Sequence, residues 1–369
     1  GEGLVSGVPL LCVIQPVLTP EDVKATAEGL ERHPALKAFL PSFLDSVGPP
    51  DAGDPFPVAY RIYYGHNTDD PVFSNKTLRN AFDAAARAQL EAHGHASIAI
   101  PRIYLPMFAL EGRLTAIWNA MAARAYRDGC GYFFMSNDDM VIYTPGTLRA
   151  AVWRLRLGVF PASEPNASAF LRSLPGALAT LDSPAVPAAL RNVTSSPWCP
   201  GLGIVRLQDL WTSWAKYTFH VSSRTHLEIF SGTYYPVPFK NSHQDYYIHK
   251  VYRRFSLSNI QRTLLVRNRV RDLSTAPPPP NRTAPSTATN DDAAPPADAR
   301  YDYDPKQEAA LAAAVFEGQG RVNEWLRGRG REVCAAGRGG ALPKAAKNWK
   351  RAAASLDEER LPKGPGREK

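Results

Sequence analysis

Short apolar runs with strand character alternate with helical patterns along the first 160 residues of the chain. Runs rich in β-branched and aromatic residues predict strands over 10–14, 58–64, 96–104 and 132–135. Between these runs, apolar residues recur at helical spacing and predict helices over 20–43, 78–93 and 114–126, with Thr19 as the N-cap of the first. Strands that alternate with helices indicate βαβ units, so we expect an α/β fold whose mostly parallel, Rossmann-like sheet is flanked by helices.

The pattern is less regular after residue 160. A stretch rich in Ala, Pro and Ser over 162–200 predicts an irregular excursion, and later patterns predict a strand over 201–205 and a helix over 246–255. Apolar positions over 306–326 predict a C-terminal helix that docks on the domain. We therefore divide the chain into an α/β domain (1–272), a Pro/Ala-rich linker (273–300), a docking helix (301–327) and a disordered basic tail (328–369).

The net charge of +8 is concentrated near the C-terminus. From Arg321 to Lys369 there are 13 basic and 6 acidic residues, whereas the first 320 residues carry 30 basic and 29 acidic residues. A nucleic-acid-binding fold carries its basic surface on the folded part of the chain. The charge distribution therefore argues against a nucleic-acid partner.

The four cysteines show no metal-binding spacing, which argues against a structural zinc site. Cys12 and Cys130 lie beside apolar runs, and we expect them to be packed thiols. Cys199 and Cys334 could form a disulfide, although the sequence does not assign one.

Four N-glycosylation sequons, beginning at Asn75, Asn166, Asn192 and Asn281, favour the secretory lumen mildly, because about two would arise by chance. No run reaches the roughly 18 apolar residues typical of a membrane-spanning helix. The chain begins with Gly1, so we expect processing or a missing upstream segment, in which a membrane anchor or signal would lie.

Acidic pairs follow two of the predicted strands. Asp69 and Asp70 come after the strand over 58–64, and Asp138 and Asp139 come after the strand over 132–135. The carboxyl ends of parallel strands meet at one edge of a sheet, where ligands bind, so these carboxylates should lie near one another. Carboxylate oxygens suit Mg²⁺ or Mn²⁺, which neutralise a diphosphate leaving group. Asn137-Asp138-Asp139 also fits a plain turn, because Asn and Asp favour turns.

These motifs, in their order and spacing, resemble GT-A-fold glycosyltransferases, which use nucleotide-sugar donors and carry an Asp-x-Asp metal motif at the end of a central strand. The resembling segments are RIYYGHNTDD (61–70), RLTAIWN (113–119) and YFFMSNDD (132–139). A later block is similar to algal and protist transferase-like proteins, and it comprises THLEIF (225–230), Tyr235-Pro236 and FKNSHQD (239–245). The resemblance covers about residues 8–327.

The resemblance implies a metal and diphosphate site at Asp138 and Asp139. Asn137 stands where the usual first Asp of the motif is found, and its carbonyl oxygen could bind without supplying charge. His243 could complete the metal shell, because imidazole binds Mn²⁺ acceptably. The expected cofactor is therefore Mn²⁺ or Mg²⁺.

The resemblance also implies donor and acceptor residues. Asp69 or Asp70 matches the acidic position that contacts the nucleoside, Asn119 matches a helix position facing the donor, and Arg113 could pair with phosphate. Asp245 matches the carboxylate that deprotonates the acceptor hydroxyl in inverting relatives, although Tyr246 follows where a second acid is expected.

The leading hypothesis is a glycosyltransferase of the Golgi or ER lumen that moves a sugar from a nucleoside-diphosphate donor to a glycan or glycoprotein hydroxyl. The alternative is a non-catalytic GT-A-like module that binds a glycan or a protein. A nucleotidyltransferase ranks lower, because the segment over 12–20 lacks a glycine-rich phosphate loop. Neither a P-loop nor a Gly-x-Ser-x-Gly elbow occurs, which argues against a P-loop ATPase and a serine hydrolase.

Overall fold

In the part of the chain that the structure describes, seven strands form one mixed sheet in the order β2-β1-β3-β6-β5-β7-β4. The computed structural model describes residues 7–48, 57–100, 114–158, 201–211, 218–239, 243–255, 257–270, 272–276 and 305–330. The strands are β1 (Leu10–Pro16), β2 (Ala59–Gly65), β3 (Tyr132–Met135), β4 (Val141–Ile142), β5 (Ile204–Asp209), β6 (His220–Ser223) and β7 (Ser258–Arg267).

Five of these strands run in the same direction. β1 pairs in parallel with β2 and β3, and β5 pairs in parallel with β7. β6 is antiparallel to both β3 and β5, and β4 is antiparallel to β7. The carboxyl ends of β1, β2, β3, β5 and β7 therefore lie at one edge of the sheet, here called the carboxyl edge. The expectation of an α/β fold with a mostly parallel sheet is confirmed.

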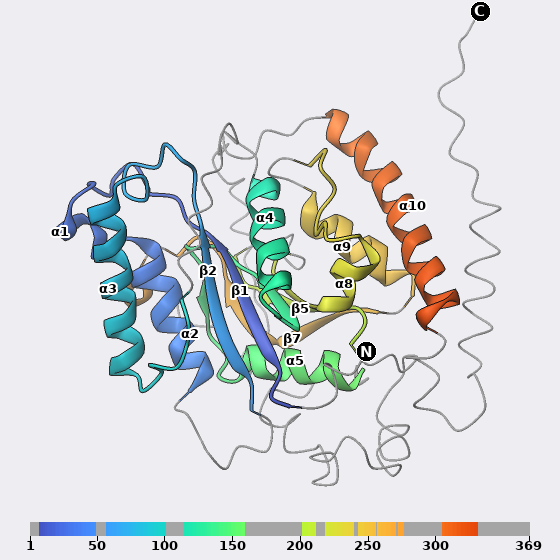
Figure 1. The fold of residues 1–369 in the computed structure, drawn as a ribbon, viewed down its shortest axis with the longest axis horizontal. Helices are drawn as coiled ribbons and strands as arrows, with labels where there is room; N and C mark the ends of the chain where they lie inside the picture. Colours follow the sequence, from blue (N-terminus) through green and yellow to red (C-terminus); the bar gives the residue numbers. More distant parts are fainter. Residues whose placement is uncertain are drawn as a thin grey trace, which may run out of the picture.

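Helices cover both faces of the sheet (Figure 1). One face carries α1 (Ala27–Leu30), the π-helix η2 (Ala35–Phe39), α2 (Leu40–Val47), α3 (Lys76–Ala92) and α5 (Thr147–Leu157). The other face carries α4 (Leu114–Arg127), α8 (Arg224–Ile229), α9 (Gln244–Arg253) and α10 (Pro305–Arg327). A short 3₁₀ helix, η5 (Leu273–Thr275), follows β7.

The apolar run of β1 is buried on both sides. Leu11 and Val13 point into the core beneath α2 and α3, whereas Cys12 and Ile14 point into the core beneath α4. Successive side chains of a strand point to opposite faces, so a strand between two helical layers needs apolar residues at every position. This explains why the run at 10–14 is continuous rather than alternating.

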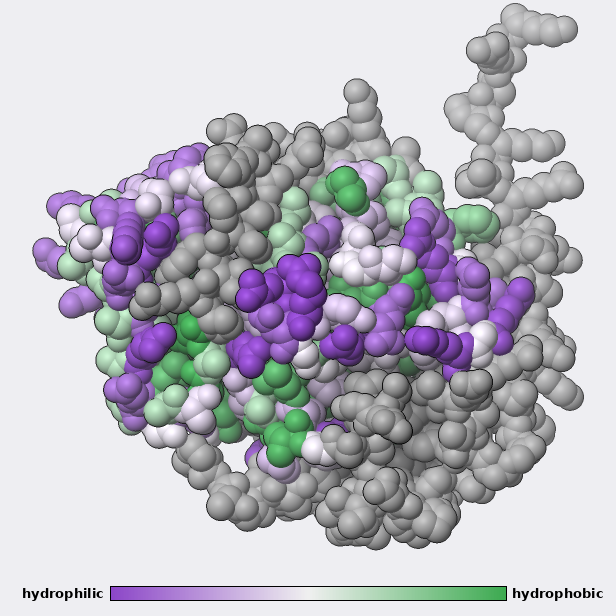
Figure 2. Space-filling model, in the orientation of Figure 1, coloured by the Kyte–Doolittle hydropathy of each residue, from purple (hydrophilic) through white to green (hydrophobic). Residues whose placement is uncertain are grey.

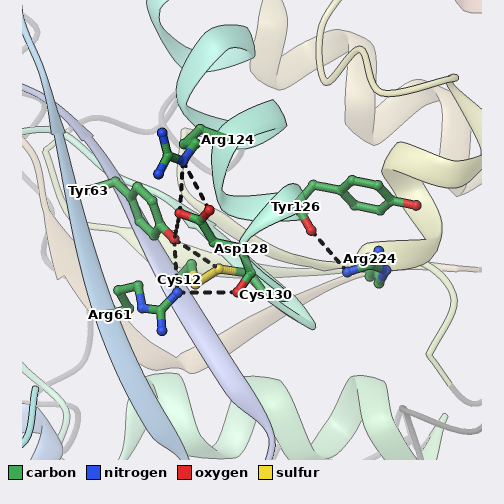
Figure 3. Close-up of polar contacts among 8 residues, drawn as sticks. All are labelled: Cys12, Arg61, Tyr63, Arg124, Tyr126, Asp128, Cys130 and Arg224. Carbon is green, nitrogen blue, oxygen red and sulfur yellow. Dashed lines mark hydrogen bonds and ion pairs between the residues drawn. A yellow bond between two sulfur atoms is a disulfide. The ribbon is translucent and has the colours of Figure 1, made fainter. Parts of the chain in front are cut away.

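Cys12 and Cys130 form a disulfide, with their Cα atoms 5.9 Å apart (Figure 3). The expectation of two packed thiols was therefore wrong. β1 and β3 are neighbours in the sheet, and this pairing brings together two buried cysteines that are 118 residues apart in the chain. Cys199 and Cys334 lie outside the described residues, so their pairing stays a prediction.

Polar contacts anchor the C-terminal end of α4 beside this disulfide (Figure 3). The Tyr63 hydroxyl donates to the Asp128 carboxylate at 3.0 Å, and Arg61 donates to the Asp128 carbonyl at 3.3 Å. On the other side, Arg224 donates to the Tyr126 carbonyl at 3.1 Å, and its guanidinium lies 3.8 Å from the centre of the Tyr126 ring. These cations suit a helix C-terminus, whose carbonyls carry partial negative charge.

Two expected elements differ in the structure. Residues 20–43 are not one helix from Thr19, because Pro20 begins a turn and α1 starts later, with Thr26 as its N-cap. The strand expected over 96–104 is represented by a single bridge between Ala99 and Arg61, and residues from 101 onward lie outside the described part.

The C-terminal helix α10 packs on α9 and α8. Most of the linker expected over 273–300, the excursion over 162–200 and the tail beyond residue 330 lie outside the described residues. Within the described ranges, none of the helices combines the length and the apolar character needed to cross a bilayer.

Candidate active site

The predicted acidic motif lies at the carboxyl edge, where it contacts the segments that follow β1 and β7. The Gln15 amide at the end of β1 donates to the Asn137 carbonyl at 3.0 Å, and the Leu18 N–H donates to Asp138 Oδ2 at 3.0 Å. The Asn137 amide donates to Asn268 Oδ1 at 3.2 Å. These bonds hold the turn after β3 between two neighbouring loops.

Asp139 is joined to the same edge by its backbone. The Val270 N–H donates to the Asp139 carbonyl at 2.6 Å. Asn137, Asp138 and Asp139 are all partly exposed at this point. The turn is thus fixed by backbone and amide contacts, and two carboxylates stand at the surface of the edge.

Asp70 is buried and holds two loops of this edge together. Its carboxylate accepts hydrogen bonds from the Thr19 N–H at 2.8 Å and the Thr19 hydroxyl at 2.7 Å. It also accepts from the N–H groups of Val72 and Phe73 at 3.0 and 2.9 Å. Thr19 therefore joins the loop after β1 to the loop after β2 instead of capping a helix. Of the two carboxylates expected near a nucleoside, Asp69 is the exposed one.

Asn119 fixes the turn at Tyr234 and Tyr235. Its amide donates to the Tyr235 carbonyl at 2.8 Å, and its Oδ1 accepts from the N–H groups of Tyr234 and Tyr235 at 3.1 and 2.8 Å. The side chain thus connects α4 to the segment after α8. Arg113, which was expected to pair with phosphate, lies outside the described residues.

Asp245 lies in the first turn of α9 and is partly exposed. Loss of hydration raises the pKa of its carboxyl well above the ordinary value, and the negative charge of Asp209 raises it further. The charge of Asp245 likewise helps to raise the pKa of the Tyr235 hydroxyl. Asp209, Tyr235 and Asp245 belong to three segments that are distant in sequence, and their side chains interact electrostatically.

Asp209, the last residue of β5, is a site residue that the sequence analysis missed. Its side chain is 1% exposed, and its Oδ1 accepts from the N–H groups of Trp211 and Asn268 at 2.9 and 3.1 Å. Burial raises its pKa to about 6, although these bonds, the Thr218 side chain and the Arg267 charge act to lower it. The available signal was an acidic residue directly after an apolar strand, as at Asp138.

Asp138, Asp139 and His243 do not assemble into a closed metal site. The described residues contain no group of three His, Cys, Asp or Glu side chains placed to hold one ion. His243 precedes α9 with a positive φ of 73°, and its ring centroid lies 6.4 Å from that of Phe239. Mg²⁺ is commonly held by one or two carboxylates together with substrate phosphates, and the partly exposed Asp138 and Asp139 fit that kind of site.

The buried His226 near this region has a structural role. The His226 ring bonds to the Tyr252 hydroxyl and to the Tyr234 carbonyl, both at 2.9 Å, and burial lowers its pKa to about 4. The Tyr234 and Tyr235 rings are each 1% exposed and belong to the core beneath α4 and α8. These rings are therefore too enclosed to offer a broad stacking face.

Chemically, the carboxyl edge presents oxygen ligands for a hard cation at Asp138 and Asp139. It also presents a carboxyl group of raised pKa at Asp245, which is suited to accept a proton. Asp70 and Asn119 serve as structural anchors around these groups. No protein-family model matches the chain, and a comparison with curated proteins finds no match to its sequence.

Proposed function

We propose that this protein is a glycosyltransferase that moves a sugar from a nucleoside-diphosphate donor to a hydroxyl group of a glycan or glycoprotein. The observation that carries the proposal is the meeting of acidic segments at one sheet edge. The turn at 137–139 is bonded to the loops after β1 and β7, and the Asn268 N–H connects the β7 loop to Asp209. The negative charge of Asp209 in turn raises the pKa of Asp245.

In this proposal the GT-A type of fold accommodates the donor at the carboxyl edge. The five parallel strands and the acidic turn after β3 support it, because open α/β sheets bind ligands at this edge. Asp138 and Asp139 would hold Mn²⁺ or Mg²⁺, which supplies positive charge to offset the departing diphosphate. Asp69 directly precedes Asp70 in the sequence and is exposed, so it is the proposed contact for the nucleoside.

Asp245 is the proposed general base. A carboxylate of raised pKa accepts a proton more readily than an ordinary aspartate does, which suits it to remove the proton of an acceptor hydroxyl. Asp209 helps to maintain this basicity through its own negative charge. Its two backbone hydrogen bonds keep its carboxylate at a fixed place relative to the β7 loop.

The proposed compartment is the lumen of the Golgi or ER. The Cys12–Cys130 disulfide supports an oxidising environment. Asn75 supports it as well, because its sequon lies exposed at the N-cap of α3 and its Oδ1 accepts from the Thr77 N–H at 2.9 Å. A glycan at Asn75 in protein from secreting cells would appear as a mass loss after glycosidase treatment. An unmodified Asn75 there would contradict this part of the proposal.

Donor hydrolysis with Mn²⁺, measured across a panel of UDP- and GDP-sugars, tests the function. We expect Asp138→Asn and Asp139→Asn each to reduce turnover about 100-fold, equivalent to about 3 kcal/mol of lost charge stabilisation. Asp45→Asn, at an exposed position on α2, is the matched control and should retain activity. Wild-type turnover in both site variants would contradict the assignment.

A non-catalytic module that binds a glycan or protein is the second candidate. Two observations favour it: Asp70 and Asn119 are engaged in structural hydrogen bonds, and the described residues lack a three-ligand metal group. Calorimetry separates the two functions. A transferase should bind a nucleoside-diphosphate sugar more tightly when Mn²⁺ is present, whereas a binding module should show no such metal dependence.

A further inference from the structure

A pocket of about 280 Å³ opens between α10 and the segment 230–238. Buried aromatic rings of Phe230, Tyr235 and Tyr247 line its inner part. Thr233, Glu317 and Arg321 lie at its mouth, where the Glu317 and Arg321 side chains are 66% and 43% exposed. Hydrophilic and apolar residues lie side by side on the face of the molecule that carries α10 (Figure 2).

Hydrogen bonds hold in place the pocket wall that is formed by the segment 230–238. Asn119 bonds to the backbone of Tyr234 and Tyr235, and His226 bonds to the Tyr234 carbonyl. The Phe239 N–H donates to the Pro236 carbonyl and closes a turn in the same segment. A wall fixed by this many bonds needs little ordering when a ligand binds.

The pocket wall that is formed by α10 packs closely against α9. A Cβ atom at Gly318 would lie 2.8 Å from a Val251 methyl and 2.9 Å from the Tyr247 hydroxyl, so only glycine allows α10 to approach α9 here. Gln319 adds hydrogen bonds to the Lys250 carbonyl at 3.1 Å and from Arg254 at 3.2 Å. The pocket therefore exists before any ligand arrives.

The lining favours a neutral ligand with both an apolar face and hydroxyl groups. Arg321 donates two hydrogen bonds to Glu317, at 3.0 and 2.8 Å, and the two side chains form an ion pair at the mouth of the pocket. The two charges offset each other, so the mouth has no net attraction for an anion or a cation, whereas hydroxyl groups can bond to both side chains. Apolar lining such as Val237 and Pro238 suits the C–H face of a sugar ring.

We propose that this pocket binds one ring of a neutral sugar, which under the proposed transferase function belongs to the acceptor glycan. Tyr247 lines the pocket and belongs to α9, the helix whose first turn contains Asp245, so the pocket and the proposed base share one helix. A sugar held here would continue toward the carboxyl edge, where its neighbour could present a hydroxyl to Asp245. The acceptor role rests on the proposed function, whereas sugar binding by the pocket does not.

Ligand-observed saturation-transfer NMR on the full chain tests this assignment. The probes are the methyl pyranosides of glucose, galactose, mannose and xylose, each without any nucleotide. Ala314 lines the pocket and Ala313 is exposed on the same helix, so Ala314→Trp and Ala313→Trp form a matched pair. At least one glycoside should give saturation transfer to wild type and to Ala313→Trp, and this transfer should be lost in Ala314→Trp.

Glu317→Gln provides a second test at an exposed position, where folding is not at risk. Loss of the charged hydrogen-bond acceptor should weaken the glycoside about tenfold. Absence of transfer from every glycoside, or equal transfer in Ala314→Trp, overturns the sugar site. Donor hydrolysis on the same preparations should be unchanged in Ala313→Trp, and its absence from wild type would contradict the transferase function but not sugar binding.

Discussion

Replacing Asp209 by asparagine should stabilise the protein above pH 6, because the native fold buries this carboxylate at a cost. Its pKa is raised from an ordinary 3.8 to about 6, chiefly by burial. Asparagine has nearly the same shape, and its Oδ1 can still accept from the N–H groups of Trp211 and Asn268. The variant therefore removes the buried charge while it keeps the two backbone hydrogen bonds.

The size and direction of the effect follow from proton linkage. Because the pKa of Asp209 is higher in the folded state, the folded protein binds more protons between about pH 4 and 6. The free energy of unfolding therefore falls as pH rises through this window, by about 3 kcal/mol for a shift of about two units. The asparagine variant does not show this fall in the free energy of unfolding, because its side chain does not titrate. Arg267 and Asp245 are the charged groups that interact with Asp209; both remain in the variant, and the pKa of Asp245 falls because the neighbouring negative charge is gone.

Urea unfolding at intervals from pH 4 to 8 measures the difference between Asp209→Asn and wild type. The variant should gain stability relative to wild type up to about pH 7 and then keep a constant advantage. Asp45→Asn, at an exposed position of α2, should show no such trend. A pH-independent difference, or a wild type that becomes the more stable protein above pH 6, would refute the burial argument.

Three further predictions concern structural contacts. The variant Cys12→Ala/Cys130→Ala should lose roughly 4–5 kcal/mol of stability, because the disulfide closes a loop of 118 residues, and the midpoint of urea unfolding measures this. Asn119→Ala should lose roughly 2–4 kcal/mol with its three hydrogen bonds, whereas Asn119→Asp keeps the acceptor and should lose less. Arg224→Lys should cost about 1 kcal/mol in thermal unfolding, because lysine stacks less well on the Tyr126 ring; an unchanged melting temperature would contradict this.

Local patterns predicted the central strands and the main helices well. The runs at 10–14, 58–64 and 132–135 correspond to β1, β2 and β3, and the pattern over 78–93 corresponds to α3. Each of these elements is long enough and apolar enough for its period to be read from neighbouring residues alone. The same reasoning placed the motif at Asp138 directly after a strand. This placement predicted that the motif lies at the carboxyl edge of the sheet.

Contacts between distant segments were not predictable in the same way. Thr19 looked like a helix cap because Pro20 and two acids follow it, yet its hydroxyl bonds to Asp70, which is 51 residues away. Asp209 becomes a site residue only because β5 runs parallel to β7 and the loops that follow them meet. Such partners depend on strand order, which a single sequence does not encode locally.

The bond between Cys12 and Cys130 has a consequence for biogenesis. Ribosomes add about 5–20 residues each second, so the first sulfur waits roughly 6–24 s for its partner to be synthesised. During that interval β1 can pair with β2, but its other side stays open until β3 arrives. Until β3 has been made, the nascent chain carries one unpaired cysteine and one open strand edge, so oxidation of this pair can only follow synthesis of β3.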